Sequence, residues 1–328
     1  MDIKRIILPI CFVLFAEIAG GQDIHFSQID VNPILTNPAY CGFFEGKARF
    51  GATYRNQWAT VSDPYQTFAA TAEYNIIRNR YHSNGFNIGA IFATDKAGSL
   101  DYGVTQGTLT LSFFQSLSKT NENFLALAVE AGFGQRSFQP GNAEMTDPSE
   151  TFGNTRTTFI DAGAGIAWMN QFSDRVSMNA GLNVKHLNRP NISYLGLDET
   201  FLEPRTTAYS RFSVWLNEAF TIRPAVMLQF QQQYSEYIYG LDLKINLAGR
   251  SYQQKNLFVG CYFRLMDAIM ASVILEYNGF LFSVNYDINI SKLKPASRSV
   301  GAFELGLVYT VKEKSRVKKV KAIPCPIF

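Results

Sequence analysis

The sequence predicts an all-β protein, a transmembrane antiparallel β-barrel of about 14 strands that follows an irregular N-terminal leader. Three observations predict it. Aromatic residues make up 14% of the 328 residues, whereas charged residues make up only 17%. After the first 21 residues, no stretch approaches the roughly 18 continuous apolar residues that a spanning helix needs. Apolar and polar side chains instead alternate with period two through long segments, as they do in strands with one apolar and one polar face.

The first element is a secretory signal peptide at residues 1–21. Charged residues precede an apolar run over residues 6–16, and Ala19-Gly20-Gly21 supplies small residues for a cleavage site. The apolar run is too short to span a membrane. We therefore expect cleavage near Gly21 and a mature chain that begins at Gln22.

Cysteine usage does not indicate a disulfide framework. Cys11 lies in the signal peptide, and the bulky Ile10 before it disfavours acylation at that position. Export leaves Cys41, Cys261 and Cys325, which is an odd number. Cys41 and Cys325 lie near opposite ends of the mature chain, and whether they pair stays open.

The second element is a leader over residues 22–46, predicted to lie in the periplasm. It begins QDIHFSQIDVNPILTNPAYCG. Its two Asn-Pro steps, Asn32-Pro33 and Asn37-Pro38, disfavour a helix at the asparagines and favour turns. The leader is therefore predicted to be irregular. Whether the lumen of the barrel is plugged stays open.

The third element is the barrel itself, over residues 47–312. The alternating segments are residues 47–58, 65–77, 85–94, 102–117, 122–136, 156–170, 174–187, 205–217, 221–233, 236–248, 256–266, 267–277, 279–290 and 300–312. Most exceed the roughly five or six residues usual in globular sheets and reach the about nine to eleven that cross a membrane at a tilt. Their number is even, as in most bacterial outer-membrane barrels.

A closed barrel follows because a bilayer offers no water to backbone N–H and C=O groups. Apolar side chains then face lipid, and polar side chains face the lumen. The charged residues predicted to face the lumen are Glu130, Lys185, Asp242, Lys244, Asp287 and Glu304. The aromatic residues predicted to lie in interfacial girdles near strand ends are Trp58, Trp168, Tyr209, Tyr277 and Tyr309.

Connection lengths predict the orientation of the barrel. A barrel that starts in the periplasm places its odd-numbered connections outside the cell, where connections are usually longer. The long connections at residues 137–155, 188–204 and 291–299 fall outside by this count. Those near residues 234–235 and 265–267 also fall outside but are short.

The last element is a basic tail over residues 313–328, predicted to lie in the periplasm. Residues 312–321 carry six positive side chains and one negative, a net charge of +5. The chain as a whole carries +3 and the signal peptide sums to zero, so the body of the mature chain carries −2. This excludes a basic nucleic-acid-binding face. The tail is a solvated extension or a docking segment for an acidic partner.

Residues that would carry catalysis or bind a metal are sparse. Only three histidines occur, His25, His82 and His186, and none has zinc-ligand spacing with a cysteine or another histidine. His186 precedes Ser193, but no nucleophile turn surrounds that serine. Phosphate-binding glycine loops are also missing. The sequence therefore predicts neither an enzyme nor a cofactor, and lumenal charges of both signs favour a paired network over an ion filter.

Several motifs resemble one family. The leader, with its His-Phe-Ser-Gln and two Asn-Pro steps, resembles the start of the PorP/SprF family of type IX secretion system membrane proteins. YRNQW at residues 54–58 is similar to the first strand of that family, and DKAG at residues 95–98 to an outer-loop signature. GCYFRLMDA at 260–268, NYDINISKL at 285–293 and GAFELGLVY at 301–309 resemble its later blocks.

The chain also departs from the family pattern. Asn285 stands where serine is usual, and Cys41 where alanine is common. The terminal Pro-Cys-Pro-Ile-Phe at residues 324–328 resembles a Cys-Pro-Arg-Phe ending, with Ile327 in place of the basic residue. These departures leave a role for the tail open.

The resemblance implies an outer-membrane barrel that helps the type IX secretion system of Bacteroidota-type envelopes to secrete or anchor a surface adhesin. The implied partners are other secretion components, the C-terminal region of a cargo protein and outer-membrane lipid. The family supplies no catalytic residue. The positions that match its motifs or are expected to contact a partner are His25, Phe26, Ser27, Gln28, Asn32, Pro33, Asn37, Pro38, Tyr54, Arg55, Gln57, Trp58, Asp95, Gly98, Arg264, Asp267 and Asp287. Each has a simpler explanation as a turn or a capped strand end.

Three functions remain open from the sequence. The first is a binding and anchoring protein without chemistry of its own. The second is a passive diffusion pore, because a barrel of about 14 strands is wide and its lumen carries mixed charges. The third is a soluble all-β adhesin, against which the long two-faced strands argue.

Overall fold

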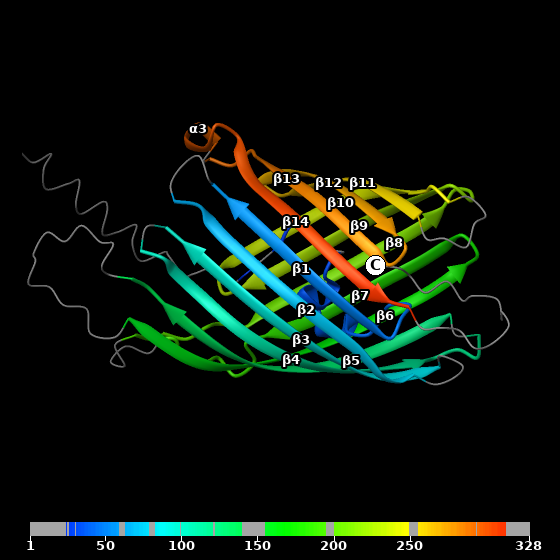
Figure 1. Ribbon diagram of the computed structural model, residues 1–328, viewed down its shortest axis with the longest axis horizontal. Helices are drawn as coiled ribbons and strands as arrows, with labels where there is room; N and C mark the ends of the chain where they lie inside the picture. Colours follow the sequence, from blue (N-terminus) through cyan, green and yellow to red (C-terminus); the bar gives the residue numbers. More distant parts are fainter. Residues whose placement is uncertain are drawn as a thin grey trace, which may run out of the picture.

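Fourteen antiparallel strands close on one another in a single barrel (Figure 1). The computed structural model describes residues 24, 26–29, 31–58, 63–78, 83–98, 100–120, 122–139, 155–194, 200–248, 255–292 and 294–312. The strands are β1 (Ala48–Gln57), β2 (Tyr65–Arg78), β3 (Asn84–Ala97), β4 (Tyr102–Ser116), β5 (Asn123–Ser137), β6 (Arg156–Ser173), β7 (Val176–Lys185), β8 (Arg205–Trp215), β9 (Phe220–Gln231), β10 (Tyr234–Asn246), β11 (Lys255–Arg264), β12 (Ala268–Tyr277), β13 (Phe280–Asn289) and β14 (Val300–Val311). Every strand pairs with its neighbours in sequence, and β1 pairs with β14 to close the barrel. The predicted fold and strand count are confirmed.

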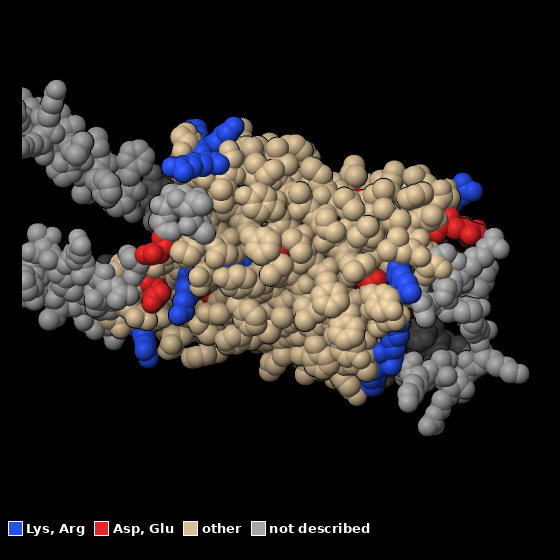
Figure 2. Space-filling view, turned by 45° about the horizontal axis from the view of Figure 1, so that its top comes forward, with Lys and Arg blue, Asp and Glu red and all other residues tan. Residues whose placement is uncertain are grey.

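The alternation along each strand separates an apolar outer wall from a polar lumen. In β5, the Val129 side chain is 59% exposed on the outside, while the next residue, Glu130, is only 7% exposed. On the face that Figure 2 shows, the outer wall carries few charged side chains between its two ends. Of the other charged residues predicted to face the lumen, Asp242, Asp287 and Glu304 are buried. Lys185 and Lys244 are partly buried.

One predicted girdle residue lies on the wrong side of the wall. Tyr209 of β8 is only 5% exposed, and its ring lies edge-on to that of Tyr40 in the lumen, with centroids 6.1 Å apart. The girdle prediction for Tyr209 is therefore wrong. Both faces of β8 carry polar side chains, so its alternation does not identify the outer face. By contrast, Tyr277 and Tyr309 are exposed near the ends of their strands.

The three longest connections lie at the same end of the barrel. They join β5 to β6, β7 to β8 and β13 to β14, and the last contains the short helix α3 (Lys294–Ser297). We call this end the long-loop end, and the opposite end, where β1 begins and β14 finishes, the terminal end. Among the described residues, none of the helices is long and apolar enough to cross a membrane.

The leader lies inside the barrel (Figure 1). It contains two short helical turns, α2 (Pro33–Thr36) and η1 (Pro38–Tyr40), and η1 contacts β4, β5, β6 and β7. Most of its described residues are buried against the wall. From its beginning near the long-loop end, the leader runs through the lumen to the terminal end and continues directly into β1.

Candidate functional site

Four charged side chains from four strands meet in the lumen near the long-loop end. Arg55 of β1 pairs with Asp287 of β13 (Nη2 to Oδ2, 2.9 Å) and with Glu304 of β14 (Nη1 to Oε2, 3.1 Å). Arg264 of β11 lies 3.5 Å from the same oxygen of Asp287. We call these four residues the docking cluster. Barrel closure assembles it, because Arg55 and Glu304 are direct partners across the β1–β14 seam.

The leader docks on this cluster through its backbone and one hydroxyl. The backbone N–H groups of Ser27 and Gln28 donate to the two carboxylate oxygens of Glu304, at 2.9 and 3.0 Å. The Ser27 hydroxyl donates to Asp287 (2.8 Å) and accepts from Arg264 (2.8 Å) and from Arg55. Each charge in the cluster thereby has a partner, as a buried charge requires.

Asn32 attaches the leader to β1 and β2. Its amide nitrogen donates to the Thr53 hydroxyl (2.6 Å), and its oxygen accepts from the Thr71 hydroxyl (3.0 Å). The leader approaches the wall closely here, because a Cβ atom added at Gly51 would lie 2.0 Å from the Asn32 oxygen. Pro33 follows as the first residue of α2, a position where its missing N–H has no helical partner to lose.

Asn37 makes the equivalent attachment to β6 and β7, farther around the barrel. Its amide nitrogen donates to the carbonyl oxygens of Ile166 (3.1 Å) and Leu182 (3.3 Å). Its oxygen accepts from the Ala39 N–H and caps η1, which begins at Pro38. The two Asn-Pro steps therefore start short helical turns and fix the leader to separate parts of the wall.

Apolar contacts hold the lower leader, residues 37–46. Tyr40 is buried, and the Phe43 ring packs on that of Phe114 with centroids 4.8 Å apart.

The Cys41 carbonyl accepts from the Ser112 hydroxyl at 2.7 Å. Burial, and secondly the nearby negative charge of Glu73, raise the pKa of the Cys41 thiol. Cys325 lies outside the described residues, so the question of its pairing with Cys41 stays open.

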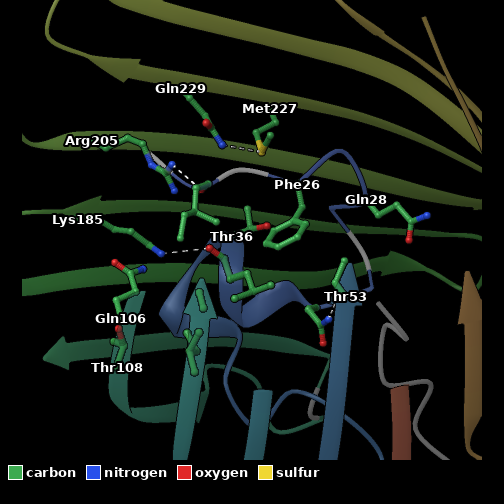
Figure 3. A pocket seen from close by; sticks show the side chains of 15 residues that line it. Phe26, Gln28, Thr36, Thr53, Gln106, Thr108, Lys185, Arg205, Met227 and Gln229 are labelled. Atoms are coloured by element: carbon green, nitrogen blue, oxygen red, sulfur yellow. Dashed lines mark hydrogen bonds between the residues drawn. The ribbon is translucent and has the colours of Figure 1, made fainter. Parts of the chain in front are cut away.

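A small cavity lined by both polar and apolar side chains lies beside the upper leader, residues 24–36 (Figure 3). Its volume is about 40 Å³, which is room for roughly three water molecules. Lys185 and Arg205 extend into this region from β7 and β8 and donate to the carbonyl oxygens of Leu35 (3.3 Å) and Ile24 (3.1 Å). Phe26 also lines the cavity. The upper leader is therefore bonded to the wall beside this cavity.

A second buried charge cluster lies on the wall of β8 to β11. Asp242 accepts from Arg223 (2.6 Å), Arg211 (2.9 Å) and the Tyr262 hydroxyl (2.6 Å). The predicted pairing of lumenal charges is therefore found in both clusters. In both clusters, the described contacts hold separate parts of the chain together.

The structure brings some of the predicted site residues together and separates others. Five of the predicted site residues belong to the docking cluster or contact it directly: Ser27, Gln28, Arg55, Arg264 and Asp287. Asp267 lies beside the cluster. The Asp267 carboxylate lies 3.0 Å from Arg264 and is 40% exposed. The Gln57 amide oxygen accepts from Arg55 at 3.4 Å. His25 lies outside the described residues.

The remaining predicted residues lie away from the cluster. Tyr54 points outward, towards lipid. Trp58 follows β1 with a positive φ of 60° and packs edge-on to Tyr65. Asp95 accepts from the Thr67 hydroxyl, and Gly98 forms the turn after β3 with φ of +67°. These positions therefore have turn and strand-end roles.

Sequence reasoning placed Glu304 in the lumen but did not identify it as a site residue. The signal was present, because Glu304 is the one charge in the closing segment GAFELGLVY and belongs to its lumenal face. Thr53 and Thr71 were missed as well, because an inward threonine in a barrel has no distinctive pattern. Among the described residues, no three His, Cys, Asp or Glu side chains lie where they could hold a metal ion together.

Comparisons with known proteins agree with this geometry. A family model described as type IX secretion system membrane protein PorP/SprF matches residues 18–309. No curated protein matches the sequence. The barrel is similar to the CymD monoaromatic hydrocarbon channel, with 9% identity, a TM-score of 0.51 and coverage of 91% of this chain and 97% of that one. It is also similar to the toluene transporter TodX of P. putida (8% identity, TM-score 0.51, coverage 86% and 95%) and to a FadL homologue of Pseudomonas aeruginosa (10% identity, TM-score 0.50, coverage 85% and 94%). At these identities the likeness concerns the fold alone.

Proposed function

Because this chain belongs to the PorP/SprF family of type IX secretion system membrane proteins, we propose that it helps that system to secrete or anchor a surface adhesin or other cargo protein. It does so by protein–protein binding and carries out no chemistry of its own. Its partners are other secretion components and the C-terminal region of the cargo.

The observation that carries this proposal is the leader inside the lumen. The leader is fixed to the wall at the docking cluster, at Asn32 and at Asn37. The cavity beside it is only about 40 Å³. A barrel filled in this way suits binding at its rim better than passage of solutes through its centre.

Orientation follows from the connections. Outer-membrane barrels have short periplasmic turns and longer extracellular loops, so we place the long-loop end outside the cell. The signal peptide of residues 1–21 is removed near Gly21. The leader then runs through the lumen from the outer end to the periplasmic end, and residues 313–328 lie in the periplasm as a basic tail. The cargo is held at the long-loop end.

Deletion of the gene tests the proposal. Cargo proteins of the type IX system should be lost from the cell surface or from the medium, measured by immunoblotting of cell and medium fractions. Reintroducing the wild-type gene should restore them, and the level of an unrelated outer-membrane barrel serves as the control. Unchanged secretion and surface retention of every type IX cargo would contradict the proposal.

The second candidate function is a passive outer-membrane diffusion pore. Its motivation is the width of a fourteen-stranded barrel whose wall carries charges of both signs. Planar-bilayer recordings of the purified full chain distinguish the two functions. We expect at most rare and brief openings, whereas steady conductance would favour the pore.

A further inference from the structure

We propose that the docking cluster is a peptide-binding site, which the leader fills in cis and vacates for a segment of a partner protein. The inference goes beyond the proposed function, because it assigns a binding site inside the lumen and the class of its ligand. The purified chain alone is sufficient to test it. The ligand class is a chain segment that presents two consecutive backbone N–H groups and a side-chain hydroxyl. Ser27 and Gln28 stand in for that segment in the structure.

The contacts at this site recognise features that many peptides share. Glu304 accepts from two backbone N–H groups, which every residue except proline has. Asp287, Arg55 and Arg264 all meet at one hydroxyl oxygen. The Gln28 side chain, in contrast, is buried with no hydrogen-bond partner for either of its polar atoms. The wall therefore makes no hydrogen bond to the Gln28 side chain. It binds groups that other peptides also have.

The charge of the wall favours a donor-rich ligand. Arg55 and Arg264 face the carboxylates of Asp287 and Glu304, and Arg264 also approaches those of Glu236 (3.5 Å) and Asp267 (3.0 Å). Two guanidinium groups thus face four carboxylates. Without the leader, the carboxylates lose the N–H and O–H donors that it provides, so a segment with free donors would replace it.

The site is near the surface of the long-loop end. Arg264 is the last residue of β11, while Arg55 and Asp287 lie two residues before the ends of β1 and β13. Asp267, which pairs with Arg264, is 40% exposed. A segment arriving at this end would therefore travel only a short distance to reach the docking cluster.

The leader can leave this site without leaving the barrel. Residues 24–28 are held by the docking cluster and by the bond from Arg205 to the Ile24 carbonyl. From Ile29 onwards the leader has buried apolar side chains, and its lower part packs on Phe114 before it continues into β1. The hydrogen bonds of residues 24–28 can exchange with those of another peptide, while the apolar contacts retain the rest of the leader.

A labelled peptide with the sequence of residues 24–33 tests the proposal by fluorescence anisotropy on the purified full chain in detergent micelles. Ser27→Ala removes the hydroxyl from the leader and so weakens the binding of the leader to the docking cluster of its own barrel. We expect this variant to bind the peptide at least tenfold more tightly than the wild type. Adding Glu304→Gln, which weakens the wall, should lower that affinity at least tenfold.

A peptide with alanine at its serine position is the matched control, and it should bind Ser27→Ala at least tenfold more weakly than the original peptide. Heat-modifiable migration in gels shows that each variant has a closed barrel. The proposal is overturned if folded Ser27→Ala does not bind the peptide, or if all three proteins bind it equally. The cargo experiment compares cells with and without the whole gene and uses no Ser27 or Glu304 variant, so its outcome is separate from this one.

Discussion

Arg55 connects three parts of the chain that lie far apart in sequence. Its guanidinium group bonds to Ser27 in the leader, to Asp287 in β13 and to Glu304 in β14. It is 1% exposed, so water cannot replace any of these partners in the folded protein. The side chain thereby neutralises carboxylates that would otherwise be buried and unpaired.

Replacement of this arginine by Met should be among the most destabilising single changes in the barrel. Arg55→Met leaves Asp287 and Glu304 with less positive charge and should lower the free energy of unfolding by about 3–5 kcal/mol. Urea unfolding in lipid bilayers measures it. Arg156→Met, at an exposed arginine that begins β6, should change the value by less than about 1 kcal/mol. Equal effects of the two substitutions would contradict a structural role for the cluster.

Cys41 makes a separate prediction about pH. Burial raises the pKa of its thiol, so the folded protein holds the neutral form, which reacts poorly with maleimides. In a Cys261→Ala/Cys325→Ala background, labelling should stay slow up to pH 9 and become fast on unfolding. Because the unfolded thiol ionises near pH 8.5, stability should be unaffected below that pH and fall above it. Rapid labelling of the folded protein at pH 8 would contradict the buried position.

Among the elements, the leader depends on space that the strands leave for it. A Cβ atom added at Gly165 of β6 would lie 2.2 Å from the Asn37 oxygen, which is held by its bond to the Ala39 N–H. Gly165→Ala should therefore displace η1 and cost about 1–3 kcal/mol. Gly107→Ala, on β4, is the matched control, because a Cβ there meets no atom within 4 Å.

A double-mutant cycle in urea unfolding separates the clash from general strand effects. Asn37→Ala removes the atom that the new methyl group meets, so Gly165→Ala should cost less in that background, with a coupling of at least about 0.5 kcal/mol. If the cost is the same with and without Asn37, the leader does not approach β6 as described.

The strands could be predicted from sequence more fully than the leader for a physical reason. A two-faced wall imposes period two on most strands, so Val129 and Glu130 already reveal which side each faces. The leader has no period, and its place in the lumen depends on single contacts such as those of Asn32. The docking cluster joins residues up to 249 positions apart, and only the closed register brings them together.

At the scale of the whole molecule, the outward-facing apolar wall is what makes this barrel a membrane protein. On the face that Figure 2 shows, the outer surface carries few charged side chains between the two ends. Val129 lies midway along the fifteen residues of β5 and is 59% exposed, so the bilayer midplane should cross the barrel near it. Phe172 also points outward, but it is the last residue but one of β6, near the terminal end.

Arginine substitutions at Val129 and Phe172 should therefore lower the free energy of unfolding by different amounts, and only a bilayer explains that difference. A charge costs about 2–4 kcal/mol at the midplane of an outer-membrane barrel and about 0–1 kcal/mol near the interface. Val129→Arg should accordingly destabilise the barrel more than Phe172→Arg when unfolding is measured in lipid bilayers. In water, both side chains would be exposed and neither substitution would require burial of a charge. Equal costs at the two depths would mean that the wall does not face hydrocarbon, and the placement of the long-loop end outside the cell would lose its basis.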